Sequence, residues 1–463
     1  MKRVSRRTFL AATGMTALAA AAAPAASAAG SENCFAAETK NVQLIGTVTD
    51  AGQVVSGMVI DYSSNPLVTV SGVDNDTYTV HAVNNLDATL AGTDIVSYGD
   101  YEIDRKIVKT EVKGSRVTVY FDQSEGATLC YTSASRNYPG ELDYTVTQNK
   151  PVTLSVLGLF GQEYTTDYFC DNTVQDEEVA KFTSEIVPGG INYQLYKPAG
   201  GADKLVVWFH GNGEGDMLGS NNNVAQVLGN RGTVAWASDE FQAILGGAYV
   251  MAFQAPDTWY YAQRDGLLDQ AAAEIRAVIS VYGIDPAKVL LSGCSAGGYM
   301  STRMLIAHPD LFAAAMINCP ALDVATDRGG QTPTDDELRS IKASGVPVWL
   351  VQGATDSSVA TDECSKRMFG LLTEGETLTE TRIAQADPNN SALTTWETAD
   401  GLYKLSLYDT TPDAMLCFAE DYDLDGVTTQ VQYSNHWSWI YTLRNNPQDA
   451  SGTHIVNWAV AQL

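Results

Sequence analysis

The pattern of apolar residues changes once along the chain, and this change limits the folds open to it. Between about residues 41 and 170, the apolar residues form short alternating runs separated by Gly, Asn and Asp. Such runs predict strands with one buried face, because successive side chains of a strand point to opposite sides. No stretch of this part has helical spacing. We therefore predict an all-β, immunoglobulin-like antiparallel sandwich over residues 41–170.

Beyond about residue 180, continuous apolar runs alternate with helical stretches. The runs suit strands buried on both faces. They lie at residues 204–209, 249–253, 289–291 and 346–351, with helical stretches such as 267–281 and 300–307 between them. This alternation predicts an α/β domain over residues 181–463, built on a mostly parallel sheet. Ligands of such sheets bind beyond the carboxyl ends of the strands, so we expect the functional residues there.

The composition is that of a folded protein with an acidic surface. Of the 463 residues, 45% are hydrophobic and 18% are charged, which excludes an intrinsically disordered chain. Lys and Arg number 28 against 55 Asp and Glu, which gives a formal charge of -27. The resulting negative field disfavours nucleic acid and anionic membrane surfaces as partners.

The first residues have the features of an export signal. Arg6-Arg7 precede an apolar, Ala-rich run that ends in the A-x-A site Ala26-Ser27-Ala28. This segment resembles a bacterial twin-arginine (Tat) signal, so we predict a signal peptide over residues 1–28 and a secreted protein. A retained membrane anchor is the alternative, but Thr interruptions and the cleavage site disfavour it. The rest of the sequence has no apolar run of 18 residues, so we expect no membrane association after cleavage.

A G-x-S-x-G motif follows one of the predicted buried strands. Residues 288–291 lead into Gly293-Cys294-Ser295-Ala296-Gly297, and an apolar helix comes next. In a turn this tight from strand to helix, larger side chains would clash, and the strained backbone exposes the Ser hydroxyl. The motif alone is weak, and its strand-turn-helix context makes Ser295 the candidate nucleophile.

A Ser nucleophile needs a base and an acid that orients the base, in the chain order Ser, acid, His. Asp356 lies just beyond the strand predicted at residues 346–351 and is the first candidate for the acid. Asp323 and Asp327, which follow an earlier strand, are the alternatives.

The base can be chosen by elimination among five histidines. His81 lies in the predicted sandwich, and His308 lies in a surface-like His-Pro-Asp turn. His210 precedes a Gly-rich loop, where we expect a structural role, and His454 lies on the final helical stretch. His436 remains, on a loop with a helix behind it, and is the candidate general base.

The Gly-rich loop at residues 210–215 is the candidate oxyanion hole. It follows the strand predicted at residues 204–209, and its small residues allow backbone amides to approach a substrate carbonyl. We expect the N–H groups of Asn212 and Ala296 to act together. A phosphate site is less favoured, because the loop lacks the Lys-Ser/Thr of a P-loop.

Aromatic residues could line the substrate pocket. Trp259 and Tyr260 follow a strand end, and Trp437 adjoins His436. We predict that these three line the pocket, with plain packing as the alternative.

The sequence predicts neither a metal nor another cofactor. Asp421, Asp423 and Asp425 match the start of a calcium loop, but position 12 is Gln432 where a Glu is needed, so we expect an acidic turn. The seven cysteines include no C-x-x-C pair. Cys319 is expected to be a buried thiol, and Cys364 with Cys417 is a possible bridge.

Three motifs together carry a family resemblance. They are Gly-Cys-Ser-Ala-Gly-Gly-Tyr-Met at 293–300, His-Gly-Asn-Gly-Glu at 210–214 and His-Trp-Ser-Trp-Ile-Tyr at 436–441. The chain resembles secreted α/β-hydrolase esterases related to polyhydroxybutyrate depolymerases and prolyl-oligopeptidase-type hydrolases, in the subgroup with an N-terminal immunoglobulin-like domain. The resemblance implies that Ser295, Asp356 and His436 form a catalytic triad. The long stretch between Asp356 and His436 departs from the family pattern, and residues 375–400 within it are polar and turn-rich, so we expect an insertion over the site there.

These features predict a secreted serine hydrolase that cleaves a small-molecule or saccharide-linked carboxylic ester. One alternative is a serine peptidase, although residues 41–170 are too short and unrepetitive for the propeller that gates prolyl oligopeptidases. The other is a non-catalytic surface-binding protein, which the complete set of candidate residues disfavours.

Overall fold

We describe the fold from a computed structural model, in which residues 37–463 form one compact unit. The described residues are Phe35, 38–86, 90, 93–217, 219–384, 386, 391–409, 415–420, 424, 426–427 and 429–463, with the backbone alone at 415–420 and 429–432. The predicted signal peptide and the acidic turn at Asp421, Asp423 and Asp425 lie outside these residues.

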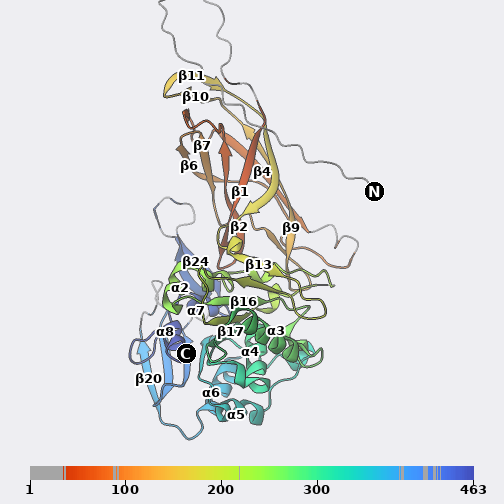
Figure 1. Ribbon diagram of the computed structural model, residues 1–463, viewed down its shortest axis with the longest axis vertical. Helices are drawn as coiled ribbons and strands as arrows, with labels where there is room; N and C mark the ends of the chain where they lie inside the picture. Colours follow the sequence, from red (N-terminus) through yellow and green to blue (C-terminus); the bar gives the residue numbers. More distant parts are fainter. Residues whose placement is uncertain are drawn as a thin grey trace, which may run out of the picture. The chain divides into compact units, whose positions relative to one another are not determined.

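The described part of residues 40–175 is built from strands in three sheets (Figure 1). The sheet orders are β12-β1-β2-β7-β6, β5-β4-β9-β8 and β11-β10-β3. All their pairs are antiparallel except β1 with β12. The strands are β1 (Lys40–Thr49), β2 (Gly52–Asp61), β3 (Val68–Ser71), β4 (Tyr78–Leu86), β5 (Tyr101–Asp104), β6 (Ile107–Lys113), β7 (Arg116–Phe121), β8 (Leu129–Tyr131), β9 (Asn137–Gln148), β10 (Val152–Val156), β11 (Leu159–Tyr164) and β12 (Tyr168–Gln175).

The rest of the chain is organised around one large sheet of ten strands, which is parallel from β16 to β22. Its two edges are antiparallel. In spatial order the strands are β13 (Phe182–Glu185), β14 (Tyr193–Tyr196), β16 (Tyr249–Phe253), β15 (Leu205–Phe209), β17 (Val289–Cys294), β18 (Ala314–Asn318), β19 (Val348–Gly353), β22 (Tyr403–Tyr408), β21 (Leu393–Thr398) and β20 (Leu378–Ile383). The predicted, mostly parallel sheet is confirmed.

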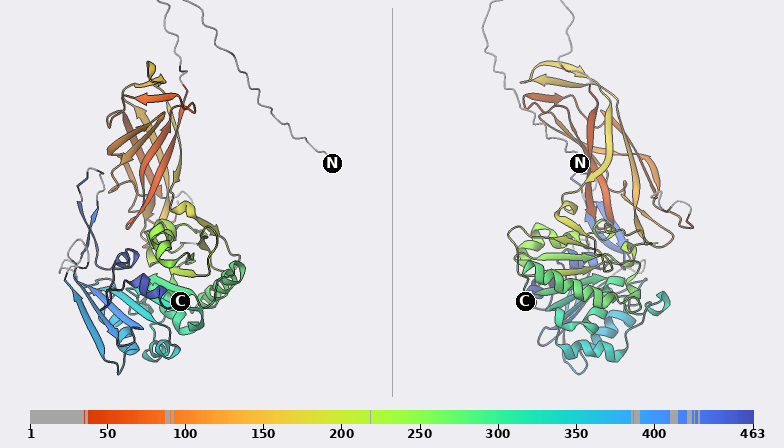
Figure 2. Two further views of the ribbon diagram at one scale, coloured as in Figure 1. Left: turned by 60° about the vertical axis from the view of Figure 1, so that its left-hand side comes forward. Right: turned by 45° about the vertical axis from the view of Figure 1, so that its right-hand side comes forward.

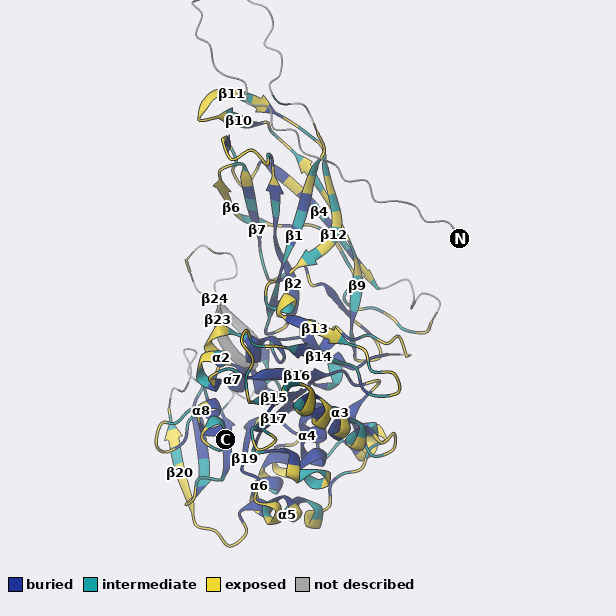
Figure 3. Ribbon diagram, viewed as in Figure 1, coloured by how far each residue is buried: buried dark blue, intermediate teal, exposed yellow. Residues whose placement is uncertain are grey.

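Helices cover both faces of this sheet (Figure 2), and the central strands between them are buried throughout (Figure 3). One apolar cluster joins the sheet to α3 (Leu267–Tyr282), α4 (Ala296–Ala307), α5 (Asp335–Ser344) and α6 (Arg367–Leu372). The other joins it to α1 (Ala225–Leu228), α2 (Asp239–Leu245), α7 (Trp439–Leu443) and α8 (Ile455–Val460). None of the helices in the described residues is long and apolar enough to cross a membrane.

The turn from β17 to α4 is packed so tightly that it requires glycine. Ser295 has φ 55° and ψ -118°, a backbone conformation that residues other than glycine rarely adopt. A Cβ atom on Gly297 would lie 2.0 Å from the carbonyl oxygen of Phe209, at the end of β15. The strand, the turn and the helix therefore fit together only with glycine at this position.

Residues 375–400 do not form the expected cover. Where described, they continue the large sheet as β20 and β21. The short hairpin of β23 (Met415–Glu420) and β24 (Thr429–Ser434) then leads to His436. The described residues of this segment thus extend an edge of the sheet, and none of those described lines the cavity discussed below.

Candidate active site

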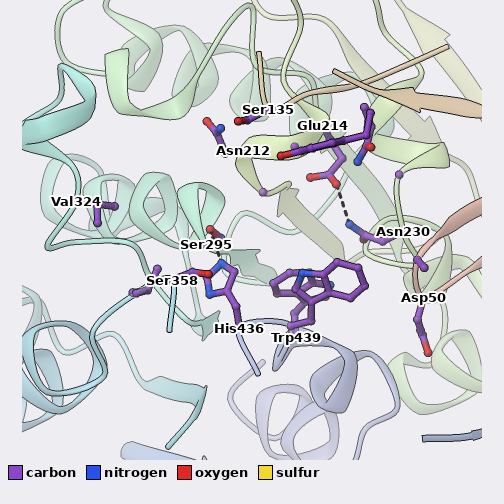
Figure 4. A pocket seen from close by; sticks show the side chains of 18 of the residues that line it. Asp50, Ser135, Asn212, Glu214, Asn230, Ser295, Val324, Ser358, His436 and Trp439 are labelled. Carbon is purple, nitrogen blue, oxygen red and sulfur yellow. Dashed lines mark hydrogen bonds between the residues drawn. The ribbon is translucent and has the colours of Figure 1, made fainter. Parts of the chain in front are cut away.

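Three of the side chains singled out in the sequence form one hydrogen-bonded chain. The Oγ of Ser295 lies 2.9 Å from Nε2 of His436, and Nδ1 of His436 lies 2.8 Å from Oδ2 of Asp356. Each residue follows the end of a strand: β17, β24 and β19, respectively. Figure 4 shows Ser295 and His436 facing one another at the floor of a pocket. Segments far apart in the sequence thus converge on one serine hydroxyl.

The carboxylate of Asp356 is completely buried and fully hydrogen-bonded. Its Oδ1 accepts the backbone N–H groups of Ser358 (2.8 Å) and Val359 (3.0 Å), and its Oδ2 also accepts from Gln352 Nε2 at 3.1 Å. These donors hold the carboxylate toward the imidazole of His436. The carboxylate can therefore orient the histidine with Nδ1 as donor and Nε2 as acceptor.

The alternative acid Asp323 has a different task. Its two carboxylate oxygens accept the backbone N–H groups of Val324 (2.8 Å) and Ala360 (3.0 Å). Asp323 therefore braces the loop that follows Asp356 and makes no hydrogen bond to His436. Asp327 is exposed on the short helix η7 (Thr326–Arg328).

The loop of His436 is fixed by its neighbour Asn435. The Asn435 side chain donates to the carbonyl oxygen of Thr355 and accepts from Ser357 Oγ at 3.1 Å. The His436 ring packs edge-on against Trp439, with centroids 5.6 Å apart. His454, by contrast, lies at the start of α8, and its buried Nδ1 has no hydrogen-bond partner among the described residues. The structure thus brings His436 to Ser295 and leaves His454 away from it.

The loop after β15 is held by a neutral histidine. His210 Nδ1 donates to the carbonyl of Gly211 (2.6 Å), and Nε2 accepts from the N–H of Ala255 (2.9 Å). Complete burial lowers the pKa of His210 to about 3, so the ring stays uncharged, as these two bonds require. The structural role expected for His210 is the one that its contacts show.

Asn212 and Ala296, the predicted oxyanion pair, flank Ser295. Asn212 begins the short helix η3 (Asn212–Glu214) and lines the same cavity as Ser295, while Ala296 is the first residue of α4. The Asn212 side chain accepts from Thr258 Oγ1 at 3.1 Å, which fixes its loop against the residues after β16. The N-terminus of α4 adds its partial positive charge beside the serine.

The three predicted pocket aromatics do not all reach the cavity. Tyr260 and Trp437 line it, as expected. Trp259 does not: its side chain is fully buried in the core, and its Nε1 donates to the carbonyl of His210 at 3.1 Å. Of two adjacent aromatic residues in the short helix η5 (Trp259–Tyr261), one supports the 210–215 loop from behind and the other faces the substrate space.

The cavity has a volume of about 550 Å³, and its wall includes residues from the strand-rich part of the chain. These are Asp50 and Ala51 from the β1–β2 turn, and Tyr131, Ser135 and Asn137 from β8, β9 and the loop between them. Arg136, in the same loop, is buried and bonds to the carbonyl (3.3 Å) and the carboxylate (3.2 Å) of Asp257. Sequence reasoning missed all of them, because no local pattern marks a contact between such distant segments.

Glu214 places a buried carboxyl group in the cavity wall. Its Oε1 accepts from Asn230 Nδ2 at 3.1 Å, the bond drawn in Figure 4. Burial raises the pKa of Glu214 to about 7, although the nearby guanidinium of Arg136 opposes the shift. The side chain is therefore protonated over much of the acidic range, where it acts as a neutral hydrogen-bonding group.

One group of potential metal ligands occurs among the described residues: Cys319, Asp356 and His436. Asp356 and His436 bond to each other, and burial raises the pKa of the Cys319 thiol well above its usual value. Asp356 and His436 serve the hydrogen-bonded chain to Ser295, so we assign no metal to this group. The prediction that Cys319 is a buried thiol is confirmed, whereas Cys364 is also free, so its predicted bridge with Cys417 is wrong.

Comparisons with known proteins give one family match and several structural likenesses. The Prolyl oligopeptidase family matches residues 254–385. A solved structure titled as a thermostable esterase has a TM-score of 0.62 at 21% identity, covering 87% of this chain and 96% of its own. Weaker likenesses are an acetyl xylan esterase from Aspergillus awamori (TM-score 0.35, 18% identity, 50% of this chain and 93% of its own) and a puromycin-hydrolyzing peptidase from Mycobacterium tuberculosis (0.32, 18%, 49% and 38%). A search of curated proteins finds no match.

The fold is therefore that of the α/β-hydrolases, as the sequence predicts. Within that class, the family match over residues 254–385 supports a serine hydrolase.

The buried carboxyl of Glu214 predicts a specific pH dependence of stability. Its folded-state pKa of about 7 lies above its ordinary value of 4.5, so the folded protein holds the proton more tightly than the unfolded chain does. Stability from this group is therefore lost as pH rises from about 4.5 to 7. In Glu214→Gln the loss should be absent.

Urea unfolding at pH 5 and pH 8 measures this effect. Between pH 5 and pH 8, the free energy of unfolding of the wild type should fall by about 2 to 3 kcal/mol more than that of Glu214→Gln. An equal pH response of the two proteins would mean that Glu214 is charged in the fold at pH 8 without penalty.

Proposed function

We propose that this protein is a serine hydrolase that cleaves carboxylic esters through an acyl-enzyme. The observation that carries the proposal is the continuous hydrogen-bonded chain from Ser295 through His436 to Asp356 at the floor of an aromatic-walled cavity. A hydroxyl that donates to a neutral imidazole, itself oriented by a buried carboxylate, is prepared to attack a carbonyl.

In the proposed reaction, His436 Nε2 takes the proton of Ser295 as Oγ bonds to the ester carbonyl carbon. The carbonyl oxygen becomes an oxyanion, which the N–H groups of Asn212 and Ala296 stabilise. The imidazolium, stabilised by Asp356, returns the proton to the departing alkoxide as the ester bond breaks. Water then repeats the sequence on the acyl-enzyme and releases the acid. Side chains, backbone amides and water account for every step.

The lining of the cavity supports an ester, rather than a peptide, as the proposed substrate. Tyr260, Trp437 and Trp439 form aromatic parts of the wall, and they suit a short acyl chain or an aromatic or sugar alcohol. Because a peptide must be held over several residues for its amine to leave, peptidases usually offer an extended cleft. The match of residues 254–385 to the Prolyl oligopeptidase family makes a serine peptidase the second candidate.

The proposal also covers the N-terminal, strand-rich part of the chain. We take residues 41–170 as an immunoglobulin-like domain ahead of the hydrolase domain at 181–463. The strands of that part support this reading, as does the thermostable esterase, whose likeness covers 87% of the chain, more than residues 181–463 alone make up. A non-catalytic surface-binding protein remains the least favoured reading, because the site is complete.

Replacement of Ser295 or His436 by Ala should lower kcat on p-nitrophenyl esters by about 10⁴-fold, because members of a triad act as a unit. Circular dichroism and thermal unfolding should show both variants folded. Ser358→Ala, in the cavity wall, and His454→Ala serve as matched controls and should retain most activity. An active, folded Ser295→Ala protein would refute the nucleophile, and a stronger effect of His454→Ala would refute the base.

The bond that is cut can be tested with two sets of substrates. For short or aromatic esters, kcat/KM should exceed that for peptide p-nitroanilides of matched size by at least ~10²-fold, about 2.7 kcal/mol in transition-state binding. Comparable values for the two sets, both abolished by Ser295→Ala, would establish the peptidase instead.

For localisation, we propose Tat-dependent export to the outside of a bacterial cell, with residues 1–28 removed. The support is the sequence Arg6-Arg7, the apolar run and Ala26-Ser27-Ala28. Replacement of Arg6 and Arg7 by Lys should retain the protein inside the cell, as measured by fractionation and immunoblotting. Unchanged secretion would point to another route.

A further inference from the structure

Three ionic side chains besides His436 line the cavity, and two of them are already engaged. Asp50 forms an ion pair with Arg444. Glu214 is buried, is hydrogen-bonded to Asn230 and has a raised pKa. Arg328 is the third, and it is exposed to solvent. Within the described part of the chain, no carboxylate lies within ion-pair distance of its guanidinium. The guanidinium lies over the ring of Tyr260, with Cζ 5.7 Å from the ring centroid.

The backbone that carries Arg328 is pressed against another part of the cavity wall. Arg328 ends η7, and the N–H of Gly330 donates to Ala325 (2.8 Å), closing the turn. A Cβ atom on Gly330 would lie 2.6 Å from the carbonyl oxygen of Tyr260. The turn can therefore approach η5 only with glycine there, and this approach sets Arg328 beside the aromatic wall.

The acidic residues around this turn leave the guanidinium available. Asp323 uses both carboxylate oxygens on backbone N–H groups. Asp327 is exposed, and no ion pair joins it to Arg328 in the structure. Because the whole chain has a formal charge of -27, an unpaired cation at the cavity is a local exception to a field that repels anions.

We propose that Arg328 binds a carboxylate of the substrate, so that the ester cleaved at Ser295 belongs to an acid or alcohol carrying a free carboxyl group. This inference rests on the proposed ester hydrolysis. A guanidinium can donate two parallel hydrogen bonds to a carboxylate, and Tyr260 beside it offers a face to an aromatic or aliphatic substrate body. The aromatic wall thus supplies contact area, and Arg328 supplies the charge that selects among neutral and anionic esters.

Two matched pairs of esters test the proposal and locate the carboxylate. Monomethyl terephthalate against methyl 4-carbamoylbenzoate places the charge on the acyl side. The second pair, 4-acetoxybenzoate against 4-acetoxybenzamide, places it on the alcohol side. In Arg328→Gln, the ratio of kcat/KM for the anionic member to that for the neutral member should fall roughly five- to tenfold in at least one pair, mainly through KM. The neutral members should be cleaved as by the wild type.

Arg264→Gln is the matched control for a general change of charge. Arg264 follows η5, pairs with Asp265 and lies over the ring of Tyr261 at 3.5 Å, but does not line the cavity. Its replacement removes the same unit charge and should leave both ratios unchanged. Unchanged ratios in Arg328→Gln, or an equal fall in Arg264→Gln, would overturn the proposal.

Binding separates this proposal from the proposed ester hydrolysis. In the Ser295→Ala protein, isothermal titration should show monomethyl terephthalate or 4-acetoxybenzoate binding roughly five- to tenfold more weakly once Arg328→Gln is added. The amide counterparts should be unaffected. Failure of the wild type to cleave any of the four esters would refute the proposed function, whereas equal binding with and without Arg328 would refute the carboxylate subsite.

Discussion

The contact between Gly297 and the end of β15 is the constraint on which the site depends. Because nothing larger than hydrogen fits between the Gly297 Cα and the carbonyl of Phe209, α4 starts directly against the neighbouring strand. That approach places Ser295 next to the loop that follows Phe209 and so brings the serine to the candidate oxyanion amides. The left-handed φ of Ser295 costs conformational free energy, and the burial of apolar side chains of α4 in the core offsets that cost.

The residues at strand ends were predictable because the rule behind them is simple. In a parallel sheet, carboxyl ends meet at one edge, so Ser295 and Asp356 could be placed near each other without knowledge of the strand order. The prediction of His436 as the base has a different basis, namely elimination among five histidines and the family resemblance. The hairpin of β23 and β24 that delivers it gave no usable local signal. The sequence does not distinguish Asp323 from Asp356 as the acid, because both follow strands and both accept hydrogen bonds from backbone amides. Only the hydrogen bond from His436 to Asp356 in the folded structure distinguishes them.

Other features could not be predicted, for physical reasons that differ. Trp259 and Tyr260 are adjacent aromatic residues after the same strand. Both are buried, but only Tyr260 lines the cavity. No sequence period marks that choice in a helix of three residues. Asp50, Tyr131 and Asn137 enter the cavity wall through packing between segments more than 150 positions from Ser295, which only the tertiary structure defines. Residues 375–400 have the composition of a polar insertion because β20, at the edge of the sheet, is largely exposed, and the neighbouring strand β21 is rich in buried threonines.

Three buried polar side chains, His210, Glu214 and Arg136, link the 210–215 loop to the strand-rich part of the chain. His210 is neutral, and Glu214, with a pKa of about 7, is protonated in the acidic range, because burial makes the ionic forms costly. In that range both side chains position the loop without adding charge beside the candidate oxyanion hole. Arg136 approaches the same loop from the β8–β9 side: a Cβ on Gly215 would lie 2.9 Å from its Nε, which has no hydrogen-bond partner in the described residues. Burying this Nε–H group without a hydrogen-bond partner costs free energy. The hydrogen bonds from Arg136 to Asp257 offset that cost and hold the guanidinium in place. The position of the oxyanion amides is therefore tied to the strand-rich part through Arg136, as well as to the sheet beneath them.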